Sequence, residues 1–321
     1  MQTTPRFALT VGPVQYWWPR ATLLDFYARL ADTPVDTIVL GEVVCSRRHE
    51  MKLADWMALA RELRAAGKDV VLATQVLVMG EAELRAAREC VAQGEFRIEA
   101  GDASALQSLR ECGDSTAFVL GPHVNIYSRE ALVEHAVLGA ACWVAPAELA
   151  LDAVARVNPP AKPVAGPAGD IATEVFVFGR LPLAFSARCF TARHHRLRKD
   201  ACAFRCLDDP DGMALRSGDG ENFLCLNGTQ VQSAGVHALL AGPAALREAG
   251  VSRLRLSPCS RDFARAVEQF DALYNRAADP VTVRAVLQSL DLPGPLVDGY
   301  AHGRPGMTML RTMAASVPDL P

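Results

Sequence analysis

Short apolar runs, rich in β-branched and aromatic residues, alternate with longer amphipathic stretches along this chain. A period of two gives way each time to a period near 3.6, which is typical of βα units. The pattern predicts eight strands, at residues 7–11, 37–44, 70–78, 97–100, 117–120, 141–144, 174–178 and 253–257.

The stretches between these strands predict crossover helices, which parallel strands require. Examples lie at residues 22–33, 54–67, 81–94 and 129–139, and several end at a glycine. Eight such units favour a closed (β/α) TIM-like barrel over a doubly wound sheet. We therefore predict an α/β fold, with residues 1–321 forming a single (β/α) barrel-like domain.

Two segments interrupt the alternation. Residues 159–169 form a Pro/Gly-rich connector, and residues 182–222 are charged and cysteine-bearing where a crossover helix is expected. A long insertion in a compact fold usually carries function. We predict a cluster-binding insertion at 182–222, between the last two strand units.

Charge and hydropathy exclude several classes of protein. A net charge of −3 offers no basic field for nucleic acid as the main ligand. No apolar run reaches the roughly 20 residues of a membrane span, and the first residues lack the pattern of a signal peptide. We expect a cytoplasmic protein with no membrane span.

The chain has nine cysteines, which in the reducing cytoplasm are packing residues, nucleophiles or metal ligands. Cys189, Cys202 and Cys206 lie as C-x12-C-x3-C among charged neighbours, unlike packing cysteines. Cys45 follows the second predicted strand, at the rim where α/β proteins place their sites. These four are the predicted ligands.

Zinc and iron–sulfur clusters both accept four thiolates. Structural zinc sites usually use two short C-x2–4-C pairs, whereas here only Cys202 and Cys206 form one. The wide spacing of the other ligands fits a 4Fe-4S cluster better. Six cations could offset its charge, although each could equally be an ordinary solvated side chain: Arg47, Arg48, Arg188, Arg193, Lys199 and Arg205.

The other five cysteines are compatible with packing: Cys90, Cys112, Cys142, Cys225 and Cys259. Cys259, at a predicted strand end, is the alternative ligand. Polar residues at predicted strand ends should face the mouth of a barrel: Glu42, Gln75, Glu99, Asp102, His123, Asn125, Tyr127, Glu148 and Glu174. His123 is either a site residue or a buried structural histidine. The aromatic run at 15–19 is a hydrophobic wall, an interface or a packing corner.

Phosphate-loop, Rossmann and zincin motifs are missing from the sequence, as is the radical-SAM pattern C-x3-C-x2-C. Four cysteine ligands would leave no iron open to a substrate. The predicted cluster therefore favours electron transfer or a structural role.

Several motifs resemble one family nearly from end to end: G-P-V-Q-Y-W-W-P, L-G-E-V-V-C-S-R-R, G-P-H-V-N-I-Y, G-R-L-P-L-A-F-S-A-R-C-F-T-A-R and G-Y-A-H-G-R-P-G-M. The chain resembles the ubiquinone biosynthesis proteins of the UbiV type, within the collagenase-like peptidase family. The resemblance carries the family's cluster ligands onto Cys45, Cys189, Cys202 and Cys206.

This resemblance implies a 4Fe-4S protein of oxygen-independent ubiquinone biosynthesis. It would form a heterodimer with a UbiU-like protein and support anaerobic ring hydroxylation of the quinone precursor, with prephenate as the hydroxyl source. One alternative is a cluster-stabilised scaffold that binds the quinone precursor or a lipid-carrier protein. A peptidase is a further alternative, although no nucleophile with a recognisable base is visible.

Overall fold

Eight parallel strands close into a barrel in the computed structural model, which describes residues 5–112 and 117–310. Strand β15 pairs in parallel with both β1 and β9, and this double pairing closes the ring. The eight predicted strands and the (β/α) barrel are confirmed. The strands are β1 Ala8–Val11, β2 Thr37–Leu40, β3 Asp69–Ala73, β4 Arg97–Ala100, β5 Phe118–Leu120, β6 Ala140–Val144, β9 Ala172–Gly179 and β15 Val251–Leu256.

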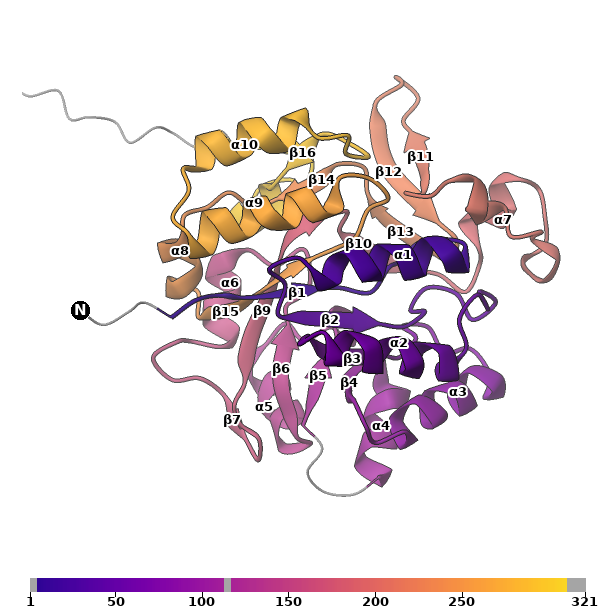
Figure 1. Cartoon of the computed structure of the whole chain (residues 1–321), viewed down its shortest axis with the longest axis horizontal. Helices are drawn as coiled ribbons and strands as arrows, with labels where there is room; N and C mark the ends of the chain where they lie inside the picture. Colours follow the sequence, from indigo (N-terminus) through magenta and orange to yellow (C-terminus); the bar gives the residue numbers. More distant parts are fainter. Residues whose placement is uncertain (1–4, 113–116, 311–321) are drawn as a thin grey trace, which may run out of the picture.

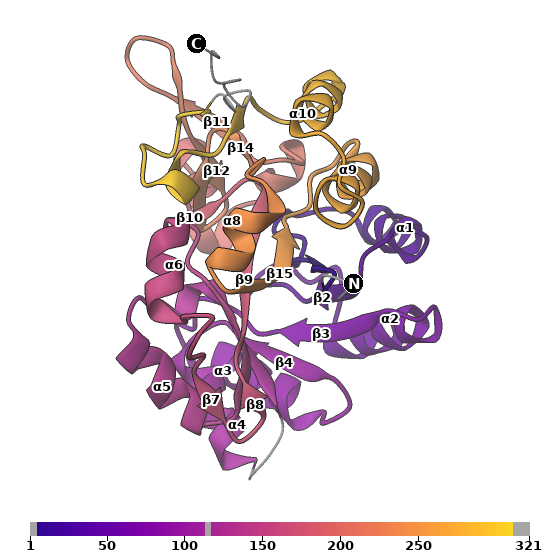
Figure 2. The same ribbon diagram turned by 90° about the vertical axis from the view of Figure 1, so that its left-hand side faces the viewer.

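Helices surround the ring of strands (Figure 2). Alternate strand residues point to opposite faces, so Ile38 and Leu40 pack against the helices while Val39 faces the barrel interior. Two apolar layers result, one inside the barrel and one between barrel and helices. The helices are α1 Arg20–Ala31, α2 Leu53–Ala65, α3 Glu81–Ala92, α4 Ala103–Glu111, α5 Arg129–Val137, α6 Leu151–Val157, α8 Pro243–Glu248, α9 Phe263–Asn275 and α10 Pro280–Ser289.

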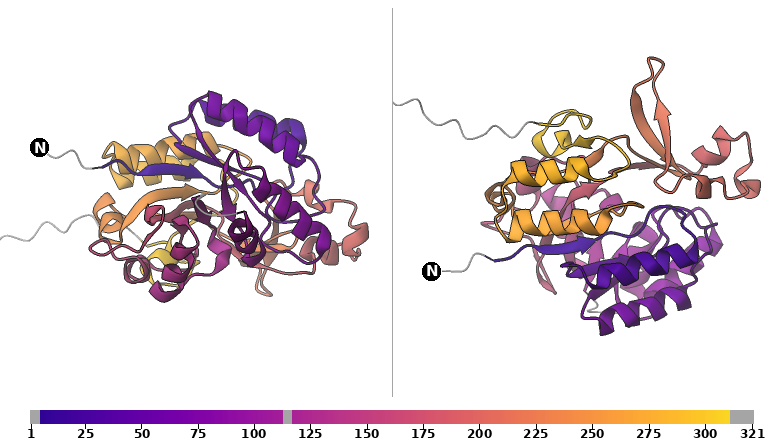
Figure 3. Two further views of the ribbon diagram at one scale, coloured as in Figure 1. Left: turned by 90° about the horizontal axis from the view of Figure 1, so that it is seen from below. Right: turned by 45° about the horizontal axis from the view of Figure 1, so that its top comes forward.

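The insertion between β9 and β15 builds a separate antiparallel sheet at one end of the barrel (Figure 1). Its strand order is β10-β13-β12-β11, and the β11–β12 hairpin stands clear of the barrel (Figure 3). The sheet continues to Ser233, beyond the cysteine-bearing segment. The elements of the insertion are β10 Pro182–Phe185, α7 Phe190–His194, η2 Lys199–Ala201, η3 Arg205–Asp208, β11 Met213–Arg216, β12 Asn222–Asn227 and β13 Gln230–Ser233.

Short elements complete the chain. In the Pro/Gly-rich connector, the two-residue strands β7 Ala165–Gly166 and β8 Gly169–Asp170 pair as a hairpin. The remaining elements are η1 Pro122–Val124, β14 Val236–Ala238, β16 Leu296–Val297 and η4 Gly299–His302. Within the described ranges, no helix is both long enough and apolar enough to cross a membrane.

The barrel interior contains a buried ion network. Arg255 donates from Nε to Glu174 at 2.6 Å and from Nη1 to Glu99 at 3.0 Å. Thr10 and Arg253 also contact Glu174, at 2.8 and 3.1 Å. Burial alone would raise the pKa of Glu174, but the two arginines hold it below its usual value. The interior of the barrel therefore contains paired charged side chains, and valine side chains surround them.

Candidate functional site: the cysteine group

The turn after β2 directs Cys45 to the rim of the barrel. Gly41 has φ +139°, and a Cβ there would lie 2.6 Å from the Ala73 carbonyl oxygen, so only glycine fits this exit from the strand. Oε1 of Glu42 then accepts hydrogen bonds from the backbone N–H groups of Val44 and Cys45, at 2.9 and 3.0 Å. These bonds fix a tight turn, and Cys45 is half-buried at its end.

Cys189 lies at the start of helix α7, where its sulfur accepts a hydrogen bond from Ala192 N at 3.4 Å. Two contacts with the β12–β13 turn hold this short helix in place. Gly228 N donates to the Thr191 hydroxyl at 3.0 Å, and Phe190 N donates to the Gly228 carbonyl at 2.7 Å. The insertion sheet thus positions the cysteine.

Cys202 and Cys206 lie on either side of a strained turn. Ala203 and Phe204, between them, both have φ 50°, a conformation that costs non-glycine residues about 1–3 kcal/mol each. The Phe204 ring stacks on Trp17, with centroids 5.5 Å apart, and the Arg47 guanidinium lies 5.8 Å from its centroid. The aromatic run at 15–19 is therefore a buried wall that holds this turn on the barrel.

Arg48 links the barrel cysteine to the insertion. Its side chain is 1% exposed and donates to Gln15 O at 2.7 Å and to Asn227 Oδ1 at 2.8 Å. Its charge acts on both Cys45 and Cys206, and Cys206 in turn interacts with Cys189 and Cys202. The four predicted cysteines therefore share one electrostatic neighbourhood.

Burial raises the pKa of the Cys45 and Cys206 thiols, and Arg48 acts in the opposite direction on both. Among the described residues, no three His, Cys, Asp or Glu side chains lie close enough together to hold a metal ion. The four thiols are free and, among the described residues, do not form a compact ligand set.

The surrounding donors fit an anionic group on these thiols. Nε of Arg47 is buried without a hydrogen-bond partner. Lys199 interacts with Cys45, and its Nζ donates to Ala187 O at 3.1 Å. The other three cations of the predicted set are solvated: Arg188 and Arg193 are exposed, and Arg205 pairs with Asp208 at 2.8 Å.

Four of the five remaining cysteines lie in packing environments. Cys142, Cys225 and Cys259 are buried, and the Cys259 thiol donates to the Arg261 carbonyl at 3.2 Å. Burial raises the pKa of Cys90 to about 12. Cys112 is exposed after helix α4.

Several of the polar residues at strand ends do not gather at the barrel mouth, so that expectation was wrong. Asp102 begins helix α4 and accepts from Ala105 N at 3.2 Å, while Tyr127 donates to Glu148 near the surface. The mouth is filled by apolar residues, including Val43, Val44, Leu181 and Phe185.

His123 also belongs to this packing. It lies edge-on to Phe185 with ring centroids 4.7 Å apart, and burial together with Arg255 lowers its pKa to about 4. The imidazole is therefore neutral at neutral pH.

The sequence reasoning missed the polar network that docks the insertion. Oε1 of Gln15 accepts hydrogen bonds from Gln230 and Gln232 at 2.9 and 2.8 Å, and Asn227 donates to the Gln15 carbonyl at 2.8 Å. Thr229 Oγ1 donates to Val44 O at 2.7 Å. The alternating Q-V-Q of β13 was the available signal, because a strand places both glutamines on one face.

Comparison with known proteins assigns the chain to a family. A model of peptidase family U32 matches residues 24–286. Among similar solved structures, the U32 peptidase Mk0906 is 13% identical, with 80% of this chain and 95% of that chain covered and a TM-score of 0.44.

More distant folds also match. Dihydropteroate synthase from Burkholderia cenocepacia is 13% identical, with coverage of 84% and 92% and a TM-score of 0.39. Dihydrodipicolinate synthase from Agrobacterium tumefaciens is 12% identical, with coverage of 88% and 80% and a TM-score of 0.35. Because the family model spans most of its length, this protein belongs to peptidase family U32.

Proposed function

We propose that this protein holds one 4Fe-4S cluster on Cys45, Cys189, Cys202 and Cys206. The supporting observation is the chain of interactions that runs from Cys45 through Arg48 to Cys206, and from Cys206 to the other two thiols. A cluster bound to four thiolates would be anionic overall, and Arg47, Arg48 and Lys199 would offset its charge.

We propose further that the protein acts in oxygen-independent ubiquinone biosynthesis, with a UbiU-like partner, in prephenate-linked ring hydroxylation of the quinone precursor. The support is the resemblance of the motifs around Cys45 and Cys189. A bound cluster would supply one-electron chemistry. The chain's own residues hold the thiols: Glu42 shapes the turn before Cys45, and Trp17 supports the strained turn between Cys202 and Cys206.

A peptidase activity has less support. A thiol nucleophile needs a lowered pKa, whereas burial raises the pKa of both Cys45 and Cys206.

The second candidate is a scaffold in which the cluster is structural. Its support is the β11–β12 hairpin, which exposes Leu215 and Phe223 away from the barrel, as a partner surface would. A cluster that resists reduction, but whose loss unfolds the insertion, favours the scaffold. A cluster that is reduced reversibly favours electron transfer.

The test is anaerobic purification followed by iron, acid-labile sulfide and zinc analysis. We expect about four irons per chain in the wild type and visible thiolate-to-iron absorption. The single variants Cys45→Ala, Cys189→Ala, Cys202→Ala and Cys206→Ala should each lose most of the iron. Cys259→Ala, a buried cysteine outside the group, should retain it. An iron-free wild type, or one that contains stoichiometric zinc, contradicts the proposal.

A further inference from the structure

A cavity of about 640 Å³ lies between the barrel wall and helices α2 and α3, at the carboxyl ends of β2 and β3. Its floor includes Leu40 and Leu72, which point outward from the barrel. Trp56 of α2 forms one wall. Ligand pockets commonly measure about 300–1,000 Å³ and are mostly apolar with a few polar groups, so the cavity has the size and character of a small-molecule site.

The sequence of α3 explains why this space is open. Ala82, Ala86 and Ala87 of α3 all line the cavity. Their small side chains leave room opposite Trp56, which larger residues would fill. The cavity is therefore walled by helices α2 and α3 on one side and by the loops after β2 and β3 on the other.

Two polar groups that line the cavity lack partners. Oε1 of Gln75 is a buried acceptor with no donor, and Nε of Arg48 is a buried donor with no acceptor. Arg48 is 4% exposed. Buried polar atoms are almost always hydrogen-bonded, so each of these requires a partner that the chain does not supply. A ligand hydroxyl can donate to Gln75 Oε1, whereas a carboxylate cannot.

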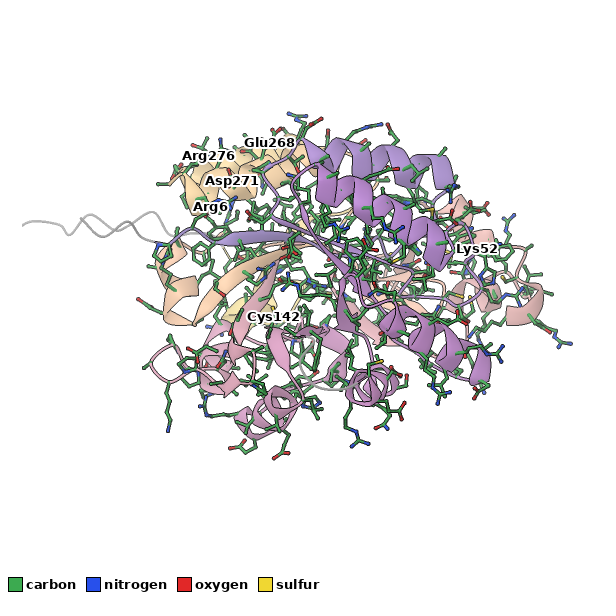
Figure 4. The ribbon with its side chains drawn as sticks, turned by 60° about the horizontal axis from the view of Figure 1, so that its bottom comes forward. Arg6, Lys52, Cys142, Glu268, Asp271 and Arg276 are labelled. Atoms are coloured by element: carbon green, nitrogen blue, oxygen red, sulfur yellow. The ribbon has the colours of Figure 1, made fainter. Side chains whose placement is uncertain are left out.

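The charges around the cavity also disfavour an anion. Three carboxylates line it, on Glu42, Glu83 and Glu89, against two permanent cations, on Arg48 and Lys52. In Figure 4, Lys52 lies at the insertion side of the molecule, away from the surface group of Arg6, Glu268, Asp271 and Arg276. A neutral ligand suits this balance.

We propose that this cavity binds a neutral small molecule with an apolar body and one hydroxyl, of the alkylphenol class, with Gln75 as acceptor. Glu42, Ser46 and Arg48 line the cavity and belong to the same loop as Cys45, so a bound ring lies beside the loop that carries this cysteine. The identity of the natural ligand rests on the proposed function, which makes the aromatic quinone precursor the candidate.

The test is equilibrium binding of para-octylphenol to the anaerobically purified full chain, measured by titration calorimetry. Para-octylanisole, which lacks the hydroxyl donor, and octanoate, which is anionic, are the comparison probes. We expect the phenol to bind about fivefold more tightly than the anisole, the worth of one hydrogen bond. Octanoate should bind more weakly than either.

Two variants connect the binding to this cavity. Ala86→Phe fills the space from an exposed helix position and should weaken octylphenol binding more than about tenfold. Ala92→Phe adds the same ring to α3 at an exposed position outside the cavity and should leave binding unchanged. Gln75→Leu should remove the preference for the phenol over the anisole. Thermal unfolding of each variant shows that it is folded.

Absence of octylphenol binding to the wild type overturns the inference, as does unchanged binding in Ala86→Phe or tighter binding of octanoate. Iron and sulfide measured on the same samples report on the cluster separately. An iron-loaded protein that binds no phenol refutes only the cavity proposal. An iron-free protein that binds it refutes only the cluster.

Discussion

Arg255 is a central side chain of the barrel interior. It is buried and pairs with Glu99 and, together with Arg253, with Glu174, and both carboxylates are buried. Removing one partner of a buried ion pair leaves an uncompensated charge, which costs about 3–5 kcal/mol.

We therefore expect Arg255→Met to lower the free energy of unfolding by at least about 3 kcal/mol, measured by urea denaturation. Arg156→Met breaks an exposed pair with Asp152, 2.7 Å apart on helix α6, and should cost less than about 1 kcal/mol. Equal losses in the two variants would show that the interior network contributes no more than a surface pair.

In the structure Cys189, Cys202 and Cys206 are half-buried, whereas Cys142, Cys225 and Cys259 are buried. Density and charged neighbours in the sequence predicted the first three as ligands. They did not distinguish Arg48 from Arg188, because neighbouring arginines differ only in what the fold packs around them. Similarly, Glu174 was expected at the mouth but lies within the barrel, paired with Arg255.

At the scale of elements, the insertion sheet is attached to the barrel by polar contacts. Gln15, in the loop after β1, accepts from two glutamines of β13 through its side chain and from Arg48 and Asn227 through its carbonyl. These groups are buried, so each donor that loses its acceptor costs about 1–3 kcal/mol.

Gln15→Leu should loosen this attachment while leaving the barrel intact. We expect faster amide hydrogen exchange in β12 and β13, residues 222–233, with little change in the barrel strands, measured by mass spectrometry. Gln107→Leu removes an exposed glutamine of helix α4 that bonds only Glu111, and it should leave exchange in β12 and β13 unchanged. Uniformly faster exchange in Gln15→Leu would mean that insertion and barrel unfold together.

Element order was predictable because each strand and helix carries its own periodicity. The antiparallel sheet of the insertion was not, since β11 and β10 have mostly exposed or half-buried residues and lack a continuous apolar run. The alanine face of α3 was likewise visible in the sequence, but the cavity it creates depends on α2 lying opposite.

For the whole molecule, buried histidine makes stability depend on pH. His237 is 3% exposed, its Nε2 lies 3.1 Å from Phe176 O, and burial lowers its pKa from 6.5 to about 4. Between these two values the unfolded chain binds a proton that the folded protein does not. The contribution of His237 to the free energy of unfolding is therefore fully present above pH 6.5 and is lost as the pH is lowered toward 4.

The loss should approach about 1.4 kcal/mol per pH unit for this one group, seen in urea denaturation across that range. His237→Gln should reduce the slope by about this amount. His194→Gln, at an exposed position of α7, should keep the wild-type slope. Identical slopes in the wild type and His237→Gln would show that the folded protein binds the proton.

The sequence by itself determined the strands and the crossover helices, because periodicity is a property of neighbouring residues. Only the tertiary structure decided that β15 closes the ring against β1 and β9, that the mouth is filled, and that Arg48 donates to Asn227 of the insertion. These contacts join segments far apart in the chain. Their free energy comes from burial of both segments against each other, which cannot be read from the sequence of either segment alone.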